Sequence, residues 1–526
     1  MVPKQAARRR FLRQGMAAAM AAAMPPGLLA ANGSLQPRAN PNFNADVELA
    51  FVARNGLARI LPQGPLTAVQ TFRAQLLKGP NSVLTELPDN YLGPILHLQR
   101  GQKVRIHFRN ELSEPSIMHW HGLHVPQISD GHPMYTVAGG ETFVYEFEVL
   151  NRAGTSFYHS HAHNLTAEQV YRGLAGLIKV SDAEEARLDL PAGEYDIPVV
   201  IQDRRFDRQN QLRYVQGMHE RMLGLMGDAV LVNGRPDAIF TVKTRAYRAR
   251  VVNGSNARIY KLAWNDGSRL WAIGSDAGLL PAPVSKPYIM LAPGERVELW
   301  LDFSGRALGE ELTLLSLPFS GAAPAMGGGM MGGPAQGAPL RIACFKMGER
   351  VGDSPRMPER LADFRRLTER DADNASAPLP IGLSMAPMSA RINGRTFAMD
   401  KVDEFERVAL GSVKKIRIFH DHARRGGMGG MGSMGMSRML ETAHPIHLHG
   451  HQFQVLSRTA DHADAGAYAS VKDGFIDSGW KDTVLVMPGE SVDVIKPFPD
   501  YKGLFLYHCH NLEHEDLGMM RQYLVE

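Results

Sequence analysis

Near its C-terminus the chain carries the segment that most limits what it can be: residues 507–519 read YHCHNLEHEDLGM. Because side chains alternate along a strand, an extended conformation places His508 and His510 on one face and Cys509 on the other. A thiolate on one face and two imidazoles on the opposite face can bind metal at two sites that only a few covalent bonds separate. The segment therefore predicts two adjacent metal sites.

Further soft ligands follow on the turn that is expected after this strand. His514 and Met519 come five and ten residues after Cys509. With one imidazole from elsewhere in the chain, these side chains form a trigonal set of two histidines and a cysteine, with a weak axial thioether. That ligand set is typical of blue-copper sites, which transfer single electrons.

The other candidate ligands come as His-x-His pairs, which place both imidazoles of a pair on one face of a strand. Four such pairs carry the candidate ligands: His119 and His121, His159 and His161, His447 and His449, and His508 and His510. The same spacing also occurs at His163, His451, His420 and His422, which are not needed to complete the cluster. His444 and His514 are left as the two imidazoles for the site around Cys509. The eight paired histidines suit a cluster of three copper ions that share two, three and three nitrogens.

These motifs resemble those of the three-domain multicopper oxidases, the family of laccases and bacterial cuprous oxidases, and no ligand position is missing. The resemblance implies four copper ions, one of type 1, one of type 2 and two of type 3, and the reduction of dioxygen (O2) to water. Electrons from the substrate would enter at the type 1 copper and reach the cluster through residues 508–510. The ligands implied by the resemblance are His444, Cys509, His514 and Met519 for type 1, His119 and His447 for type 2, and His121, His159 and His510 together with His161, His449 and His508 for the two type 3 ions.

Reducing dioxygen to water consumes protons, so acidic side chains are expected near the cluster. Asp130 falls after His119 where the family carries an acidic proton donor, and Glu515 resembles a second donor. Asp130 precedes a glycine and also suits an ordinary turn. For the second donor, Glu513 and Asp516 compete with Glu515.

Residues 1–31 are expected to be an export signal rather than part of the fold. The run RRRFLR at residues 8–13 resembles a twin-arginine motif, and the apolar run at 16–24 is too short to span a bilayer. We expect cleavage near Ala30 or Ala31, export of the folded protein by the twin-arginine machinery, and a periplasmic location.

Charge gives no sign of a nucleic-acid or membrane partner. Residues 1–31 hold five basic residues and no acidic one, so the formal net charge of +4 becomes −1 when they are removed. The basic balance of the whole chain therefore belongs to the export signal. We expect the mature protein to be a monomer that does not insert into a membrane.

Repeated short strands predict an all-β chain of three consecutive Greek-key β-sandwich domains, which the resemblance identifies as cupredoxin domains. A glycine-centred turn leads into an alternating strand three times, at residues 140–148, 293–302 and 488–495. The predicted limits are 45–182 for the first domain, 192–346 for the second, which binds no copper, 351–380 for a connector, and 381–526 for the third, with the type 1 copper.

The distribution of histidines assigns the domains different tasks. The middle domain contains only His219, so it cannot hold a histidine-rich copper site and is expected to act as a spacer. The first and third domains each supply two His-x-His pairs, which places the cluster at the interface between them. Copper binding should then hold these two domains together. The second cysteine, Cys344, lies in a strand-like run and is expected to be a buried packing residue.

Two stretches rich in methionine and glycine, at residues 326–333 and 426–439, favour Cu(I) as a substrate, because thioethers prefer Cu(I). The second stretch directly precedes His444, so its methionines are candidates for recruiting Cu(I): Met428, Met431, Met434, Met436 and Met439. On this interpretation the chain oxidises Cu(I) in copper tolerance and also oxidises phenols. One alternative is a laccase for phenols and aromatic amines with a passive loop. The other is a non-catalytic cupredoxin-fold scaffold, which the intact ligand set disfavours.

Shortening residues 426–439 to a few Gly and Ser residues should raise the apparent KM for Cu(I), because the soft thioethers next to His444 are lost. Oxidation of a bulky phenol should stay the same or become faster. Steady-state oxygen uptake with each substrate checks this, and equal losses for both substrates would indicate general damage instead. Unchanged Cu(I) kinetics at limiting copper, with all copper retained, would favour the laccase alternative.

Overall fold

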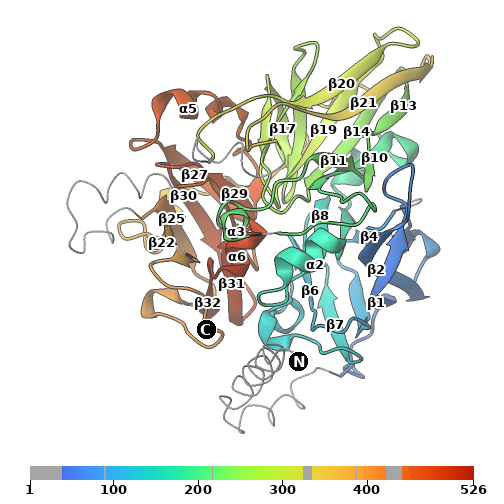
Figure 1. The fold of residues 1–526 in the computed structure, drawn as a ribbon. Helices are drawn as coiled ribbons and strands as arrows, with labels where there is room; N and C mark the ends of the chain where they lie inside the picture. Colours follow the sequence, from blue (N-terminus) through green and yellow to red (C-terminus); the bar gives the residue numbers. More distant parts are fainter. Residues whose placement is uncertain (1–37, 88–89, 216, 324–333, 387, 422–440) are drawn as a thin grey trace, which may run out of the picture. The chain divides into compact units, whose positions relative to one another are not determined.

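Three pairs of β-sheets follow one another along the chain in the computed structural model, which describes residues 38–526 apart from 88–89, 216, 324–333, 387 and 422–440 (Figure 1). The first sandwich joins the sheet of β1 (Val47–Ala58), β2 (Thr67–Lys78), β5 (Lys103–Asn110) and β7 (Thr142–Glu148) to that of β3 (Leu84–Thr85), β4 (Ile95–Gln99), β6 (Met118–His121), β8 (Gly154–Ser160) and β9 (Ala175–Ser181). Its strands hold the first two His-x-His pairs at their ends.

The middle sandwich has a larger sheet, made of β10 (Asp196–Arg204), β11 (Ala229–Val232), β12 (Arg235–Pro236), β14 (Ala246–Asn253), β16 (Leu270–Ser275), β17 (Gly278–Lys286) and β19 (Arg296–Asp302). Its second sheet is made of β13 (Ile239–Lys243), β15 (Tyr260–Trp264), β18 (Ile289–Leu291), β20 (Glu311–Ser316) and β21 (Leu340–Glu349). Cys344 is buried and unpaired in β21.

The third sandwich joins the sheet of β22 (Leu379–Ala386), β23 (Ser389–Ile392), β25 (Val413–His420), β27 (Phe453–Thr459), β28 (Trp480–Lys481) and β30 (Ser491–Pro497) to that of β24 (Arg407–Val408), β26 (His444–Leu448), β29 (Thr483–Val486), β31 (Gly503–Cys509) and β32 (Met520–Val525). The α-helices among the described residues are short: α2 (Thr166–Arg172), α3 (Met218–Leu223), α5 (Ala465–Ala469) and α6 (Leu512–Asp516). The prediction of an all-β chain of three sandwiches is confirmed.

The sequence repeat corresponds to one structural unit that occurs three times. In each sandwich a strand runs parallel to its neighbour, which in turn pairs antiparallel with the strand after the glycine turn: β1, β5 and β7, then β10, β14 and β19, then β22, β25 and β30. The turn glycines Gly140, Gly294 and Gly489 have φ of 86, 82 and 76°. Residues with a Cβ atom rarely adopt such backbone φ values, which explains why glycine recurs at these turns.

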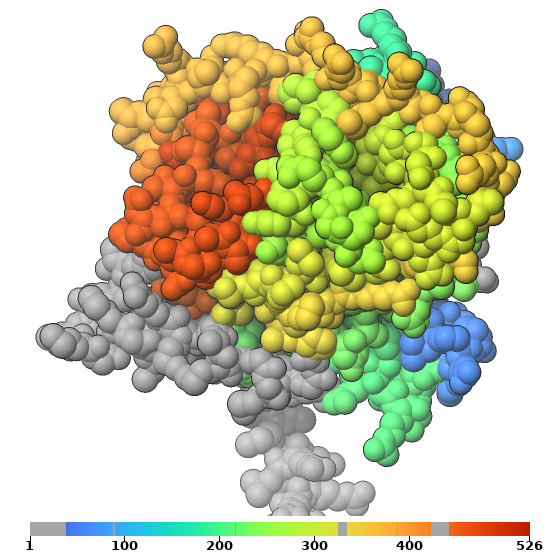
Figure 2. All heavy atoms as spheres, turned by 90° about the horizontal axis from the view of Figure 1, so that it is seen from above, coloured from blue at the N-terminus to red at the C-terminus, as the bar shows by residue number. Residues whose placement is uncertain are grey.

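Each sandwich encloses its own apolar core, and further buried clusters join the sandwiches. One cluster lies between the first and middle sandwiches and includes Phe157 and Val200. Another joins the middle and third sandwiches and includes Met290 and Leu485. Figure 2 shows the atoms of these last two sandwiches in continuous contact. The sandwiches are therefore held against one another by buried apolar surface, which positions the histidine strands.

Between β21 and β22 the described chain has no strand and a single 3-10 turn, Glu369–Asp371. The predicted connector at 351–380 lies in this part, and the domain limits stay a prediction. The expected export signal lies outside the described residues and also stays a prediction. No helix among the described residues combines the length and the apolar character needed to cross a bilayer.

Candidate metal centre

In the third sandwich, strand alternation separates two groups of metal-binding side chains. Cys509 on β31 faces the sandwich core and lies opposite Ile446 of the neighbouring strand β26. His508 and His447, one residue along on each strand, lie opposite each other in the ladder. His444 lies two residues before Ile446 and so joins the Cys509 side. One pair of strands thus presents ligands on both of its faces.

The first sandwich presents its histidines by the same alternation. His119 of β6 pairs directly with His159 of β8, and both imidazoles are buried. Trp120 and Tyr158, the opposite pair in the ladder, point into the core of the first sandwich instead. These two aromatic side chains fix the rotation of both strands, so the imidazoles on the other face converge.

The four His-x-His pairs come together between the first and third sandwiches. Four contacts join nitrogens of different pairs: His119 Nε2 to His447 Nε2 at 3.3 Å, His161 Nε2 to His508 Nε2 at 3.3 Å, His449 Nε2 to His508 Nε2 at 3.2 Å, and His159 Nε2 to His121 Nδ1 at 3.4 Å. Three groups of three imidazole ligand atoms each lie within 4.8 Å: His119, His121 and His159; His119, His447 and His449; and His161, His449 and His508. We call these residues together with His510 the histidine cluster. The structure therefore places the histidine cluster at the interface between the first and third sandwiches, as the sequence predicted.

Most imidazoles of the histidine cluster have one nitrogen committed to the protein. The Nδ1–H groups of His119 and His447 donate to the backbone carbonyls of Asp130 and Asp482, at 2.6 and 2.9 Å. His159 donates in the same way to the carbonyl of Ser160, at 2.8 Å. These bonds leave Nε2 without a proton and directed at the cluster, as metal-bound histidines require.

The residues present fit copper. His510 is buried, yet neither of its ring nitrogens has a hydrogen-bond partner, and Nδ1 of His161 is also without one. A buried polar atom without a partner is costly, and imidazole nitrogens suit copper. Burial lowers the pKa of His161 and His510 well below the usual value, so both rings are neutral and offer lone pairs.

A second group lies on the core face of the same strands, around Cys509. Its Sγ lies 3.4 Å from His444 Nδ1 and 3.7 Å from His514 Nδ1, and the two nitrogens are 3.3 Å apart. The Nε2–H of His514 donates to the carbonyl of Met222 at 3.0 Å, which leaves Nδ1 free for a metal. Met519 is fully buried, and its carbonyl accepts from the backbone N–H of Cys509.

The thiol of Cys509 is inert without a metal. Burial raises the pKa of Cys509, because a thiolate in an apolar core has no solvation. A bound copper ion supplies the positive charge that deprotonates a coordinating thiol. The group of His444, Cys509 and His514 thus fits a copper ion, in agreement with the ligand set expected from the sequence.

Asp130 joins the two halves of the cluster. Its backbone carbonyl accepts from His119 of the first sandwich, and its Oδ2 lies 2.8 Å from His449 Nδ1 of the third. The next residue, Gly131, has φ of 81°, and a Cβ there would lie 2.4 Å from the carbonyl of Met118. Asp130 therefore sits in the turn that the sequence allowed, but it also contacts two cluster imidazoles. Burial raises the pKa of Asp130.

The structure places Glu515, and neither of its competitors, beside the cluster. Its Oε2 lies 3.1 Å from His508 Nδ1 and its Oε1 lies 3.7 Å from His161 Nε2. Glu513 instead accepts from Asn256 at 2.8 Å, and Asp516 accepts from the backbone N–H of Ala167 at 3.0 Å. Among the three acidic residues on α6, Glu515 is therefore the one positioned to act as the second proton donor.

Sequence reasoning missed Asp482 and its partner Arg296. Asp482 Oδ1 lies 3.0 Å from His121 Nε2, and both residues are buried. Arg296, at the start of β19 in the middle sandwich, donates to Asp482 Oδ1 at 2.7 Å. Although burial raises it, the pKa of Asp482 is held well below the usual range by Arg296. The signal was available: Lys481 and Asp482 place adjacent charges in front of the apolar run of β29.

The middle sandwich is thus more than a spacer. It provides no member of the histidine cluster, as its histidine count predicted, but it supplies Arg296 to the third sandwich. Asp276 and Glu295, also of the middle sandwich, accept from Lys481 at 3.0 and 3.2 Å. This buried ion-pair network holds Asp482 where it meets His121 of the first sandwich.

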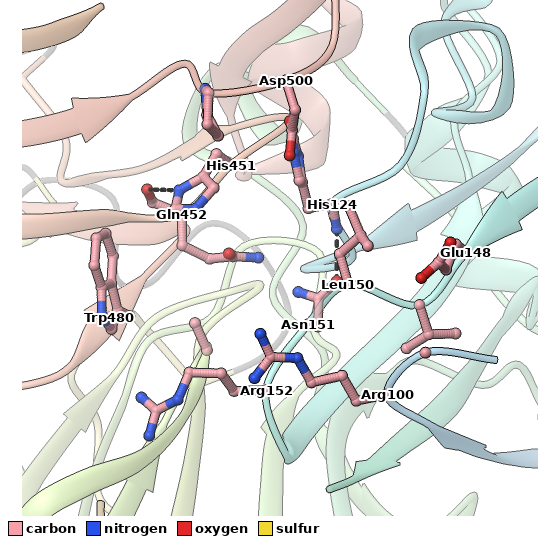
Figure 3. Close-up of a pocket in the computed structure, with 14 residues that line it drawn as sticks. Arg100, His124, Glu148, Leu150, Asn151, Arg152, His451, Gln452, Trp480 and Asp500 are labelled. Carbon is pink, nitrogen blue, oxygen red and sulfur yellow. Dashed lines mark hydrogen bonds and ion pairs between the residues drawn. The ribbon is translucent and has the colours of Figure 1, made fainter. Parts of the chain in front are cut away.

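A polar pocket of about 510 Å³ opens close to the cluster, where the three sandwiches meet (Figure 3). His124 and His451 line this pocket instead of joining the cluster. His124 Nε2 lies 2.5 Å from Asp500 Oδ1, and His451 donates to the carbonyl of Gln452 at 2.8 Å. The side chain of Gln452 in turn donates to the carbonyl of Gly122, next to His121.

The predicted histidine ligands and Cys509 therefore gather in two groups, and Asp130 and Glu515 lie against the histidine cluster. Their roles, and that of the buried Met519, stay predictions. The five methionines proposed to recruit Cu(I), Met428, Met431, Met434, Met436 and Met439, lie outside the described residues, and their role stays a prediction.

Neutral imidazoles in a buried cluster, with a thiol one residue away on the same strand, define a copper oxidase that reduces dioxygen. The comparisons agree. The family model described as Multicopper oxidase matches residues 68–185 and, through a second model of that description, residues 431–526. The chain belongs to the multicopper oxidase family, and its similarity to the relatives described next establishes this membership.

Among these relatives, "Multicopper oxidase mco" of Staphylococcus haemolyticus is 31% identical over 436 residues, 83% of this chain and 82% of its own length. "Laccase" of Bacillus subtilis is 30% identical over 479 residues, with 82% and 87% covered. The crystal structure of the McoA multicopper oxidase from Aquifex aeolicus superposes with a TM-score of 0.74 at 32% identity, over 92% of this chain and 97% of that one. These matches confirm the resemblance and the cupredoxin-like fold.

Removing copper should lower the unfolding temperature and make the protein sensitive to acid. Burial lowers the pKa of buried histidines in both ligand groups, to about 3 for His447 of the histidine cluster and to about 4 for His514 beside Cys509, so these rings are neutral when folded. Unfolded histidines take up protons below about pH 6.5, so stability is complete above that pH and is lost as the pH falls toward the folded pKa. Each imidazole can contribute up to about 1.4 kcal/mol per pH unit.

Calorimetry of copper-free and copper-loaded protein between pH 7 and pH 5 measures this. The loaded protein at pH 7 is the control, because a ligand that binds only the folded state stabilises it. An unfolding temperature of the copper-free protein that stays constant over this pH range would contradict the neutral cluster.

Proposed function

We propose that the protein holds four copper ions and couples one-electron oxidation of substrates to the reduction of dioxygen to water. The observation that carries the proposal is the end of β31: Cys509 belongs to one ligand group, while His508 before it and His510 after it face the other. The ring centroid of His510 lies 4.9 Å from that of His121 and 5.3 Å from that of His159. Few protein arrangements put two metal groups within three consecutive residues. The link suits transfer of single electrons from an entry site to a cluster.

The proposed ligands keep the assignments expected from the sequence. His444, Cys509, His514 and Met519 hold the type 1 ion, and His119 and His447 hold the type 2 ion. The type 3 ions take His121, His159 and His510, and His161, His449 and His508. In support, two of the three imidazole groups with ligand atoms within 4.8 Å combine the first and third sandwiches: His119, His447 and His449, and His161, His449 and His508.

When bound, copper supplies the one-electron chemistry, and the protein supplies geometry and protons. Met222 and Asn511 fix the ring of His514 through contacts at its Nε2 of 3.0 and 3.2 Å. Complete burial of Cys509 keeps water away from the sulfur. Asp130 and Glu515, each against cluster imidazoles, are positioned to hold protons for the four that one dioxygen consumes.

For the substrate we propose Cu(I), in copper tolerance, together with small phenols. The support is the methionine-rich stretch directly before His444 and the soft character of thioethers. A relative named "Laccase" supports the alternative of phenol and aromatic amine oxidation with a passive loop. A non-catalytic scaffold is disfavoured, because each ligand position holds a suitable side chain. The two substrates are separated by oxygen uptake with Cu(I) and with a phenol.

We also propose that the protein works in the periplasm as a monomer after export by the twin-arginine machinery. The arginine run at residues 8–13 and the small residues at 28–31 support export. Detection of the mature N-terminus in a periplasmic fraction, and its loss when Arg8 and Arg9 become Lys, tests this.

Replacing Cys509 with Ser should abolish the intense blue absorption and the oxidation of substrates, because the thiolate ligand is lost. Copper analysis should fall from four ions to three, with the cluster largely spared. The matched control is Cys344→Ser, the same change at a buried cysteine of the middle sandwich, which should keep the blue colour. Persistent blue colour in Cys509→Ser would overturn the assignment.

Asp130→Asn should keep all copper but slow the reoxidation of reduced enzyme by dioxygen, because an amide cannot deliver protons. The expected loss is about 10²-fold, within the range for a general acid. Asp500→Asn is the matched control, since Asp500 also meets an imidazole but faces the polar pocket. Single-turnover rates equal to wild type at every pH would show that Asp130 has no role in proton supply.

A further inference from the structure

A second cavity reaches the histidine cluster from a different side. It lies in the apolar cluster between the first and middle sandwiches, under β8, β9, β10 and β14. Its walls include Phe157, Leu177, Val200 and Val252, and His510 of the histidine cluster also lines it. Its volume is about 20 Å³, little more than the roughly 10–15 Å³ that one water molecule needs.

Almost nothing in this cavity can bind water. Of its polar side chains, Gln202 accepts from the hydroxyl of Tyr91 at 2.8 Å, and Ser255 is bonded to Tyr260 at 2.9 Å. Only the nitrogens of His510 lack partners, and these are the atoms that fit copper. An ordered buried water needs two to four polar partners, whereas apolar cavities stay dry and take up apolar molecules such as xenon.

The polar pocket in Figure 3 has the opposite character. Arg100, Arg152, Asn151 and Asp500 line it, so its lining hydrates readily. The cluster is thus approached by one polar and one apolar cavity. The two small reactants differ in polarity in the same way as the two cavities. Protons travel through polar surroundings, whereas dioxygen is apolar and uncharged.

We propose that the apolar cavity is a dioxygen site that supplies the histidine cluster at His510, an inference that rests on the proposed function. Its size accepts one diatomic molecule, its walls exclude water, and one of its walls is His510, a residue of the cluster. Leu87 and Gly254 are the lining residues that are partly exposed. Gln202 and Ser255 stay bonded to their neighbours and do not compete for dioxygen.

Filling the cavity should slow the reaction with dioxygen and nothing else. Val200 and Val252 are neighbours in the parallel ladder of β10 and β14, and both line the cavity. Val200→Leu combined with Val252→Leu should lower the second-order rate constant for reoxidation by at least about threefold, because two added methylenes fill so small a space. The oxygen KM should rise, while anaerobic reduction of the blue copper by substrate stays at the wild-type rate.

The matched control changes the adjacent pair on the same strands. Val199 and Val251 are also ladder neighbours, but they face the core of the middle sandwich. Val199→Leu with Val251→Leu adds the same atoms and should leave the oxygen rate constant at the wild-type value. An equal loss in both double variants would mean general damage to the fold and would overturn the proposal.

A crystal of the copper-loaded wild type under xenon gives a second measurement that does not depend on activity. Xenon should occupy the cavity next to His510 and should be displaced in the Val200→Leu, Val252→Leu variant. An empty cavity under xenon would overturn the proposal, as would displacement of xenon with no change in the oxygen rate constant. A protein lacking four coppers or failing to reduce its blue copper would instead contradict the proposed function, and xenon would still decide the cavity.

Discussion

Eight imidazoles buried in one place, with too few hydrogen-bond partners, are the constraint on which the rest of the structure depends. Nitrogens of the first and third sandwiches meet at 3.3 Å, where two lone pairs would repel. Copper removes the conflict by accepting those lone pairs. We therefore expect the metal to contribute to the attachment between the first and third sandwiches. The backbone carbonyls of Asp130 and Asp482 fix the tautomers of His119 and His447 that leave Nε2 free to bind it.

The middle sandwich supports this junction without holding a ligand. Arg296 of the middle sandwich donates to Asp482 of the third, and Asp482 in turn contacts His121 of the first. A charge in the middle sandwich thus orients an imidazole in the first through a residue of the third. A buried ion pair costs desolvation and is weak evidence for stability, but breaking one partner leaves an unpaired buried charge. Because the pair of Arg296 and Asp482 lies beside the cluster, we infer that it serves to position His121 rather than to stabilise the fold.

Much of the site was predictable because a strand alternates its side chains. The spacing of His508, Cys509 and His510 alone implied two groups on two faces, and the structure shows both groups at the end of β31. The glycine-centred repeat likewise predicted β7, β19 and β30. The pairing of Asp482 with Arg296 could not be predicted from the sequence, because ion pairs between domains depend on how the sandwiches pack. The apolar cavity was also beyond reach, since single apolar residues carry no mark of the space between them.

The most direct test of the account is anomalous diffraction at the copper edge from fully loaded crystals. The account predicts four copper positions: one bonded to Cys509 Sγ and to Nδ1 of His444 and His514, and three among the imidazoles of the histidine cluster. His510 should be a ligand of one of the three. No copper beside Cys509, or a histidine cluster that holds a single ion when copper is in excess, would contradict it.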